Sequence, residues 1–255
     1  MRYLKGFYMA LGMFIGIPLP YHFWDEKYSS LMVASIPLVG VVIGLVWWLA
    51  GLGLMVLGVP LMLMAALMAL APFYIAGFIH LDGYMDTSDA LLSYRHTEEK
   101  LRLLKDPNVG TFAVVMLGVL CVLQFAAIHG IVESGRFLAL LIPITVISRG
   151  CSAMSILVLR HAPQSSYAQM LVKGVGVNHR VFIVVTAAVA VLFSVLYAGA
   201  LGFAVVLAVI LGYAVAMRYA YRGLDGVSGD LLGYSLVIGE LCGLIAFAGL
   251  YGRLA

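Results

Sequence analysis

Long apolar segments alternate with short polar ones along almost the whole chain. The apolar segments are residues 31–50, 58–79, 111–132, 137–159, 181–198, 202–217 and 231–251. A helix needs about 20 apolar residues to cross the hydrocarbon core of a bilayer. All of these segments are near that length, although 202–217 is short. The pattern therefore predicts an all-α, polytopic membrane protein with about seven transmembrane helices.

The composition agrees with this pattern. Of the 255 residues, 64% are hydrophobic and 11% are charged, whereas ordinary globular proteins carry roughly 25% charged residues. So few charges would leave most of a globular surface unsolvated. We therefore expect a single integral membrane domain over residues 1–255, without a soluble second domain.

The first twenty residues have some features of a signal peptide. Arg2 and Lys5 precede an apolar run that ends in Ile17-Pro18-Leu19-Pro20, without a small-residue cleavage site. The run is also short for a full span. We expect this segment to be retained as an interfacial or re-entrant element.

The positive charges are distributed unevenly between the two expected sides of the membrane. Twelve of the fifteen Lys and Arg residues lie in residues 1–30 and in the longer connections near 80–110, 160–180 and 218–230. Strict alternation of the spans puts these four segments on one side, which the positive-inside rule makes cytoplasmic. The net charge is only +3 and no Lys/Arg-rich run occurs, so nucleic acid is not an expected partner.

Three acids, Asp82, Asp86 and Asp89, introduce the most polar connection. On a helix, steps of four and three residues place them on one face. Asp82 and Asp86 are close enough to share one hard divalent cation, Mg²⁺ or Mn²⁺. Asp89 lies about 10 Å along the axis from Asp82, so it is a candidate for a second metal or for a catalytic base. The alternative is a solvated acidic helix end with no ion.

Other polar residues interrupt apolar surroundings. His80 is a candidate catalytic ligand or base, or else a polar anchor at the membrane boundary. Arg149 lies inside a span, where a charge costs about 2.5 to 3.5 kcal/mol; it either binds a phosphate or pairs with an acid from another helix. Asp230 opens the last span and Glu240 lies deeper in it, either as members of a pocket with Asp82 or as a cap and a buried partner.

Two local patterns predict packing rather than chemistry. Thr97 as N-cap and Lys105 in the last turn predict a short helix at the membrane surface. Gly40 and Gly44 have the spacing that allows close helix contact, which we expect to be used within the chain.

Part of this polar pattern resembles a known family. The segments that carry the resemblance are His80-Leu81-Asp82-Gly83 with Asp86 and Asp89, then Lys105-Asp106 and Gly110-Thr111-Phe112, and more weakly Ile17 to Pro20, Ser148-Arg149, Tyr167-Ala168, and Gly226 to Asp230 with Gly233. Together they strongly resemble the cobalamin synthase family, the adenosylcobinamide-GDP ribazoletransferases. Gln169 departs from the pattern, since an arginine is expected there.

The resemblance implies a multi-pass enzyme of the bacterial inner membrane with its active site on the cytoplasmic side. It implies a transferase that joins adenosylcobinamide-GDP to α-ribazole or its phosphate, requires Mg²⁺ and releases GMP in the last stage of cobalamin biosynthesis. Further partners to be tested are a second copy of the chain and the upstream enzymes of the pathway.

The candidate residues have roles that suit this reaction. Asp82 and Asp86 would hold Mg²⁺ on the diphosphate, and Asp89 would be a further ligand or the base. The candidates for substrate binding are Asp230 and three basic residues that would neutralise phosphate charge, Arg95, Lys105 and Arg149.

Two rival functions use similar residues. A CDP-alcohol phosphotransferase also places acids at a membrane helix end, but its longer motif requires an aspartate three residues before Asp82, where this chain has Ile79. A cation transporter would use the acids as an ion path, although such sites lie near the bilayer midplane. GMP release from adenosylcobinamide-GDP distinguishes these functions.

Overall fold

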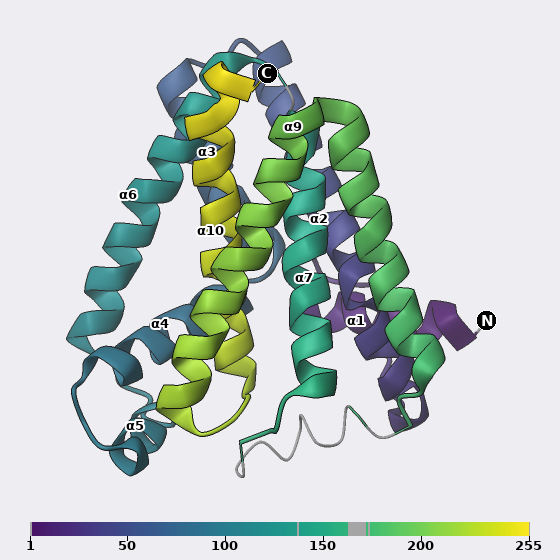
Figure 1. Ribbon diagram of the computed structural model, residues 1–255, viewed down its shortest axis with the longest axis vertical. Coiled ribbons are helices and arrows are strands. Elements are labelled where there is room, and N and C mark those ends of the chain that lie inside the picture. The colour runs from purple at the N-terminus through teal and green to yellow at the C-terminus, as the bar shows by residue number, and fades with distance from the viewer. Residues whose placement is uncertain (1, 137, 163–171, 173, 255) are drawn as a thin grey trace.

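The protein is a bundle of helices. The computed structural model describes residues 2–136, 138–162, 172 and 174–254. The helices are α1 (Arg2–Phe14), η1 (Glu26–Tyr28), α2 (Ser29–Val56), α3 (Leu61–Ile75), α4 (Ile79–Leu92), α5 (Thr97–Leu103), α6 (Thr111–Ser134), η2 (Leu138–Leu140), α7 (Leu141–Val158), α9 (Val177–Leu224) and α10 (Gly229–Leu254) (Figure 1). The described residues add only one isolated β-bridge, between His161 and Val227. The expected all-α class is confirmed.

The expected count of seven spans is not confirmed. Within the described residues, five helices are long and apolar enough to cross a membrane, or six if α3 and α4 form one broken span. The expected spans 181–198 and 202–217 both lie in α9, which has 48 residues and non-helical backbone at Ala198 and Gly199. At 1.5 Å per residue, α9 would be about 72 Å long if straight, more than twice the hydrocarbon core. Figure 1 shows it turning back on itself.

A sharp bend separates α3 from α4. Gly77 and Phe78 have φ angles of 67° and 62°, in the left-handed region that stops a helix. After this link, α4 runs at 93° to α3 and crosses the bundle in Figure 1. The segment that carries Asp82, Asp86 and Asp89 is therefore a helix of its own, and it is too short to be a span by itself.

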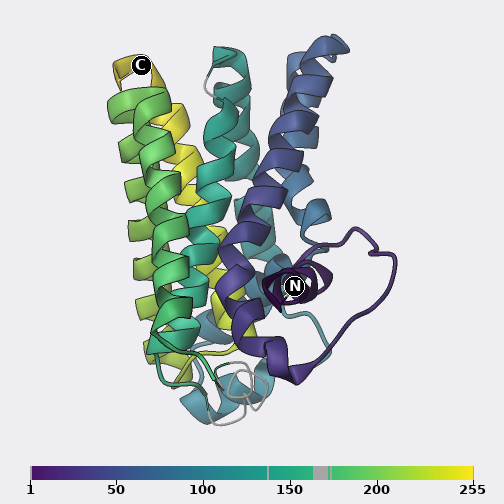
Figure 2. The same ribbon diagram turned by 90° about the vertical axis from the view of Figure 1, so that its right-hand side faces the viewer.

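The first helix runs across the bundle. Figure 2 looks almost along α1, whereas α2 runs close to the long axis. Helix α1 has 13 residues and is not among the candidate spans of the described chain, as expected for an interfacial segment. The chain then contacts the bend, where the Gly16 amide donates a hydrogen bond of 2.9 Å to the Ile75 carbonyl.

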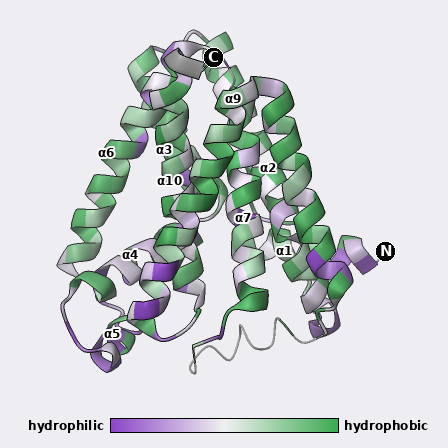
Figure 3. Cartoon of the chain, in the orientation of Figure 1, coloured by the Kyte–Doolittle hydropathy of each residue, from purple (hydrophilic) through white to green (hydrophobic). Residues whose placement is uncertain are grey.

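Hydrophilic residues gather at one end of the bundle, here called the polar end. In Figure 3 it holds α5 and its flanking connections, the start of α10 and the N-terminal region. The end of α7 and the start of α9 lie there as well (Figure 1). The helix ends that flank the long polar connections thus lie at one end, as alternation of the spans predicts, and the expected surface helix is present there as α5.

Hydrogen bonds between helices accompany the apolar core. Trp47 is fully buried and its Nε1 donates to the Met68 carbonyl at 2.8 Å. Thr145 Oγ1 donates to the Gly40 carbonyl at 2.7 Å, where α2 and α7 pack closely, so the glycine spacing at Gly40 and Gly44 is used within the chain. Such bonds satisfy groups that lipid cannot solvate.

Candidate active site

A cavity of about 240 Å³ lies between α1, α2, α4, α7 and α10. The residues that line it are Met13, Phe14, Ile36, Ile79, His80, Asp82, Arg149, Ser152, Ile156, Gly229, Asp230, Leu232 and Leu236. Four of the residues singled out in the sequence, His80, Asp82, Arg149 and Asp230, therefore meet in one place. We call this space the acidic cavity.

Close packing of α4 on α10 brings the two acids together. A Cβ at Gly83 would lie 2.8 Å from Asp230 Cα, and one at Gly233 would lie 3.1 Å from the His80 carbonyl oxygen. Only glycine allows backbones to approach this closely. The Asp82-Gly83 pair thus places a carboxylate beside the start of α10, where Asp230 provides a second one.

Arg149 pairs with the acid that lies deep in the last span. Its guanidinium Nη1 is 2.5 Å from Glu240 Oε1, and Ser148 Oγ donates to the same oxygen at 2.7 Å. The side chain of Arg149 is only 2% exposed. The pairing of Arg149 with an acid from another helix is therefore confirmed. Arg149 also lines the acidic cavity, and its binding of a phosphate stays a prediction.

Three buried polar atoms of residues that line this cavity have no hydrogen-bond partner in the described structure: His80 Nε2, Arg149 Nε and Ser152 Oγ. The imidazole of His80 also stacks on Phe14, with ring centroids 5.9 Å apart. Burial, followed by the positive charge of Arg149, lowers the pKa of His80 to about 3, so the ring is neutral. Since buried polar groups are normally satisfied by protein, water or a bound ion, these atoms are available to bind water or a polar ligand.

The aspartates near the cavity have no ion-pair partner among the described residues. Burial, followed by the negative charges of Asp82, Asp230 and Asp89, raises the pKa of Asp86 to about 6. None of the ion pairs found in the described part of the chain involves these four acids. Neighbouring carboxylates repel one another, and a bound cation removes this repulsion. A site that offers only oxygen ligands suits a hard divalent cation.

The carboxylates are not already assembled as a metal site. Among the described residues, no three His, Cys, Asp or Glu side chains converge closely enough to hold an ion. Asp82 and Asp230 are the two acids that line the cavity. A cation there would take its remaining ligands from Asp86, from water or from a phosphorylated substrate. The predicted pairing of Asp82 with Asp86 on a metal stays a prediction.

Asp89 lies elsewhere. The position of a Cβ on Gly110 would be only 2.0 Å from Asp89 Oδ1, so the carboxylate packs directly on Gly110, the residue that precedes α6. An acid at this place is favoured by the positive end of the helix dipole. This contact joins two parts of the motif recognised in the sequence, and it gives Asp89 a structural role outside the lining of the cavity.

The other predicted phosphate ligands also lie outside that lining. Arg95 is an exposed residue of the α4–α5 connection, and Lys105 follows the end of α5. The sequence did not identify Met13 and Phe14 as part of the cavity wall, because nothing local marks an apolar residue of α1 as a neighbour of α4. Tyr167, Ala168 and Gln169 lie outside the described residues.

The fold and the site define a class of protein, a polytopic helical membrane protein with a buried cavity that is lined by two acids, an arginine and a histidine. Comparison with known proteins identifies the family. Residues 6–248 match the family model described as cobalamin-5-phosphate synthase, and the chain belongs to this family.

Curated relatives agree with the family assignment. A protein of Clostridium botulinum (strain Eklund 17B / Type B) is 38% identical, over 95% of this chain and 96% of its own length. A protein of Pseudomonas savastanoi pv. phaseolicola is 34% identical, over 91% of both chains. Both are named adenosylcobinamide-GDP ribazoletransferase. No solved structure gives a significant match. The family assignment favours the transferase over the lipid enzyme and the cation transporter.

Proposed function

We propose that this chain is an adenosylcobinamide-GDP ribazoletransferase that works at the cytoplasmic face of a bacterial inner membrane. A ribose hydroxyl of α-ribazole, or of its phosphate, attacks the phosphorus on the cobinamide side of the diphosphate. The bond to the bridging oxygen breaks and GMP leaves. The observation that carries the proposal is the meeting of Asp82, Arg149, Asp230 and His80 in one cavity of a chain that belongs to this family.

Arg149 and His80 supply hydrogen-bond donors or acceptors for the diphosphate. Arg149 lines the cavity, and its Nε has no hydrogen-bond partner in the described part of the chain. A guanidinium binds phosphate oxygens with fixed geometry. Glu240 holds Nη1 of Arg149 at 2.5 Å and so fixes the direction of the guanidinium. The burial of these groups strengthens their interaction with charge that develops on the phosphate.

Asp82 and Asp230 are the residues that would hold Mg²⁺, with Asp86 beside them. When bound, Mg²⁺ supplies positive charge that offsets the negative charge on the diphosphate oxygens. The hydroxyl that attacks must lose its proton, and Asp86, which lies beside the two ligands, is the carboxylate that accepts it. This assignment replaces Asp89, which is held against Gly110.

The decisive experiment supplies the reconstituted full chain with adenosylcobinamide-GDP, α-ribazole and Mg²⁺. We expect GMP and adenosylcobalamin in equal amounts. An absence of GMP together with a flux of divalent ions into vesicles would contradict the proposal and favour transport.

Replacement of the cavity acids is expected to stop the reaction without unfolding the protein. Asp82→Asn and Asp230→Asn should each lower kcat by about 10²- to 10³-fold, the range seen when one group that stabilises transition-state charge is removed. The matched control is Asp106→Asn, because Asp106 is an exposed loop acid that does not line the cavity. Full activity of Asp82→Asn would exclude Asp82 as a ligand.

Removal of divalent ions is expected to abolish GMP release. After treatment with a chelator, Mg²⁺ and Mn²⁺ should restore turnover, whereas Ca²⁺, which prefers more ligands and longer bonds, should restore much less. The measurement is the initial rate of GMP formation against the concentration of added ion. Undiminished turnover in excess chelator would show that the cavity acids serve another purpose.

A further inference from the structure

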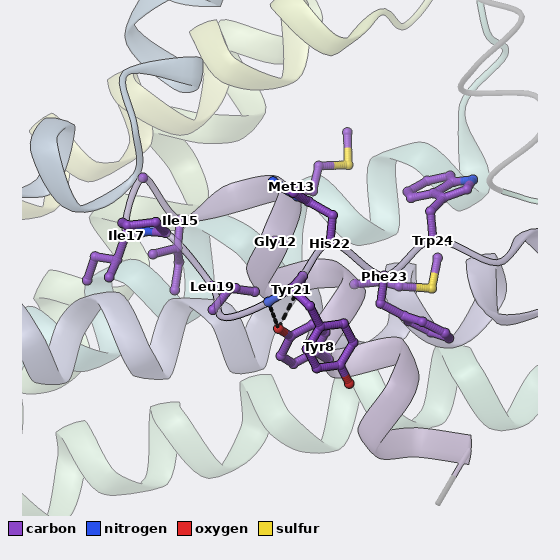
Figure 4. Close-up of a pocket in the computed structure, with 13 residues that line it drawn as sticks. Tyr8, Gly12, Met13, Ile15, Ile17, Leu19, Tyr21, His22, Phe23 and Trp24 are labelled. Atoms are coloured by element: carbon purple, nitrogen blue, oxygen red, sulfur yellow. Dashed lines mark hydrogen bonds between the residues drawn. The ribbon is translucent and has the colours of Figure 1, made fainter.

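A second pocket lies between α1 and the segment that follows it. It has a volume of about 420 Å³ and is lined only by residues from 8 to 24, among them Tyr8, Gly12, Met13, Tyr21, His22 and Trp24 (Figure 4). This volume is within the range of about 300 to 1,000 Å³ that is usual for small-molecule sites. We call it the aromatic pocket.

Specific contacts hold the wall of this pocket together. The rings of Tyr8 and Tyr21 stack with centroids 4.9 Å apart. Tyr8 Oη donates to the Tyr21 carbonyl at 2.8 Å, and the Tyr21 amide donates to Tyr8 Oη at 3.4 Å (Figure 4). These contacts fix the returning segment to α1, so the pocket is a built feature of the N-terminal region.

The aromatic pocket adjoins the acidic cavity. Met13 lines both spaces, and Phe14 lines the acidic cavity and stacks on His80. Met13 therefore forms part of the wall of both spaces. Methionine is flexible and adapts to irregular contacts, which suits a wall between two parts of one substrate.

We propose that the aromatic pocket binds the base of the ribazole substrate, an inference that rests on the proposed function. The base is a benzimidazole with methyl groups and only one unsubstituted ring nitrogen, so it matches a wall of aromatic and apolar side chains. Guanine carries several donors and acceptors, which would be costly to bury among these residues. The corrin ring with its amide side chains is too large for the pocket. The ribose then passes Met13 and brings its hydroxyl to the acidic cavity.

Binding of the base is tested first without any reaction. Calorimetric titration of the full chain in detergent with dimethylbenzimidazole and with α-ribazole should show that both bind and that each displaces the other. Guanosine should not displace them. Displacement by guanosine, or no binding of either ligand, would overturn the proposal.

A variant that fills the pocket then tests the location. In Gly12→Leu, the added Cβ would lie 3.5 Å from Leu19 Cδ1, an ordinary contact, so the backbone accepts the change while the side chain occupies the pocket. The KM for α-ribazole should rise about tenfold or more, equivalent to about 1.4 kcal/mol, with the KM for adenosylcobinamide-GDP unchanged. The matched control is Gly118→Leu on α6, where a Cβ meets nothing within 4 Å.

A second pair of variants keeps the test independent of Gly12. Tyr21→Ala removes a ring from the pocket, and Tyr3→Ala removes an exposed ring of α1 that does not line it. Only Tyr21→Ala should weaken binding of dimethylbenzimidazole, by up to about tenfold.

The outcomes separate this inference from the proposed function. If Gly12→Leu and Tyr21→Ala raise only the KM for adenosylcobinamide-GDP, or change neither KM, the base site is overturned. GMP release by the wild type would still uphold the transferase in that case. A wild-type chain that binds the base but releases no GMP would uphold the site and contradict the transferase.

Discussion

Among single residues, Arg149 shows how a charge is kept inside the bundle. Its guanidinium is 2% exposed and shares Glu240 with Ser148. A buried pair of this kind gains little net stability over an apolar pair, but removal of one partner leaves an uncompensated charge. The pair therefore holds the positively charged guanidinium of Arg149 beside the acidic cavity.

Loss of the acid is expected to destabilise the protein strongly. Glu240→Ala should lower the free energy of unfolding by about 3 to 5 kcal/mol, because Arg149 would remain buried without a counter-charge. The double variant Arg149→Met with Glu240→Met should recover most of that stability, yet remain inactive. Thermal unfolding in detergent and GMP release measure the two effects.

The matched control for this pair is the exposed ion pair of Lys27 and Asp25. Asp25→Asn should leave the unfolding temperature unchanged, because pairs in water contribute little. An unchanged unfolding temperature in Glu240→Ala would mean that Arg149 finds its stabilisation elsewhere.

The sequence identified the charged residues that line the cavity, but it did not show how they contact one another. Asp82, Arg149 and Asp230 stand out because ionisable groups are rare among apolar residues. Their pairing depends on how helices far apart in the chain pack, so Arg149 had both a phosphate and an acid as candidate partners. Asp89 has suitable spacing on α4, but the direction of its side chain is set by Gly110, which no local pattern reveals.

Among the helices, the contact of α4 with α10 positions the site. The acids come from two helices, and their distance depends on how closely the backbones approach at Gly83 and Gly233. Any side chain at Gly83 must separate the helices, since the nearest atoms belong to the backbone of Asp230.

A single added methyl group at this contact is expected to impair both folding and catalysis. Gly83→Ala should destabilise the protein by about 1 to 3 kcal/mol, the usual cost of overpacking, and should reduce the rate of GMP release. Gly118→Ala is the matched control, because its Cβ would meet nothing and alanine favours a helix by up to about 1 kcal/mol. Equal stability of the two variants in thermal unfolding would refute the close contact.

Apolar length predicted most helices and the break in α9, since Ala198 and Gly199 lie where segment 181–198 was expected to end, but it missed the break between α3 and α4. The segments 111–132 and 231–251 correspond to α6 and α10 with only small changes at their ends. The bend at Gly77 and Phe78 interrupts an apolar run without a polar signal. The hydrophobic pattern shows which residues avoid water, but it does not show where a buried backbone changes direction.

In the described part of the molecule, the helix ends that flank the long polar connections lie at one end. Most of the Lys and Arg residues lie in those connections and in the N-terminal region, whereas Arg136 lies in the short connection between α6 and α7. By the positive-inside rule, this distribution supports the cytoplasmic orientation proposed above for the polar end.

Labelling of single cysteines tests this orientation. In a background with Cys121, Cys151 and Cys242 replaced by Ala, a membrane-impermeant maleimide should label Glu98→Cys only in inverted vesicles. It should label Arg136→Cys only in intact spheroplasts. Reversal of the two results would place the active site on the other face.

The seating of the N-terminal region against the bend has a practical consequence. Gly16 is hydrogen-bonded to the end of α3, and Met13 and Phe14 complete a wall around the acids. Proteolytic removal of the first sixteen residues would therefore open the acidic cavity to its surroundings. An affinity tag fused ahead of α1 would disturb the part of the molecule that closes this cavity.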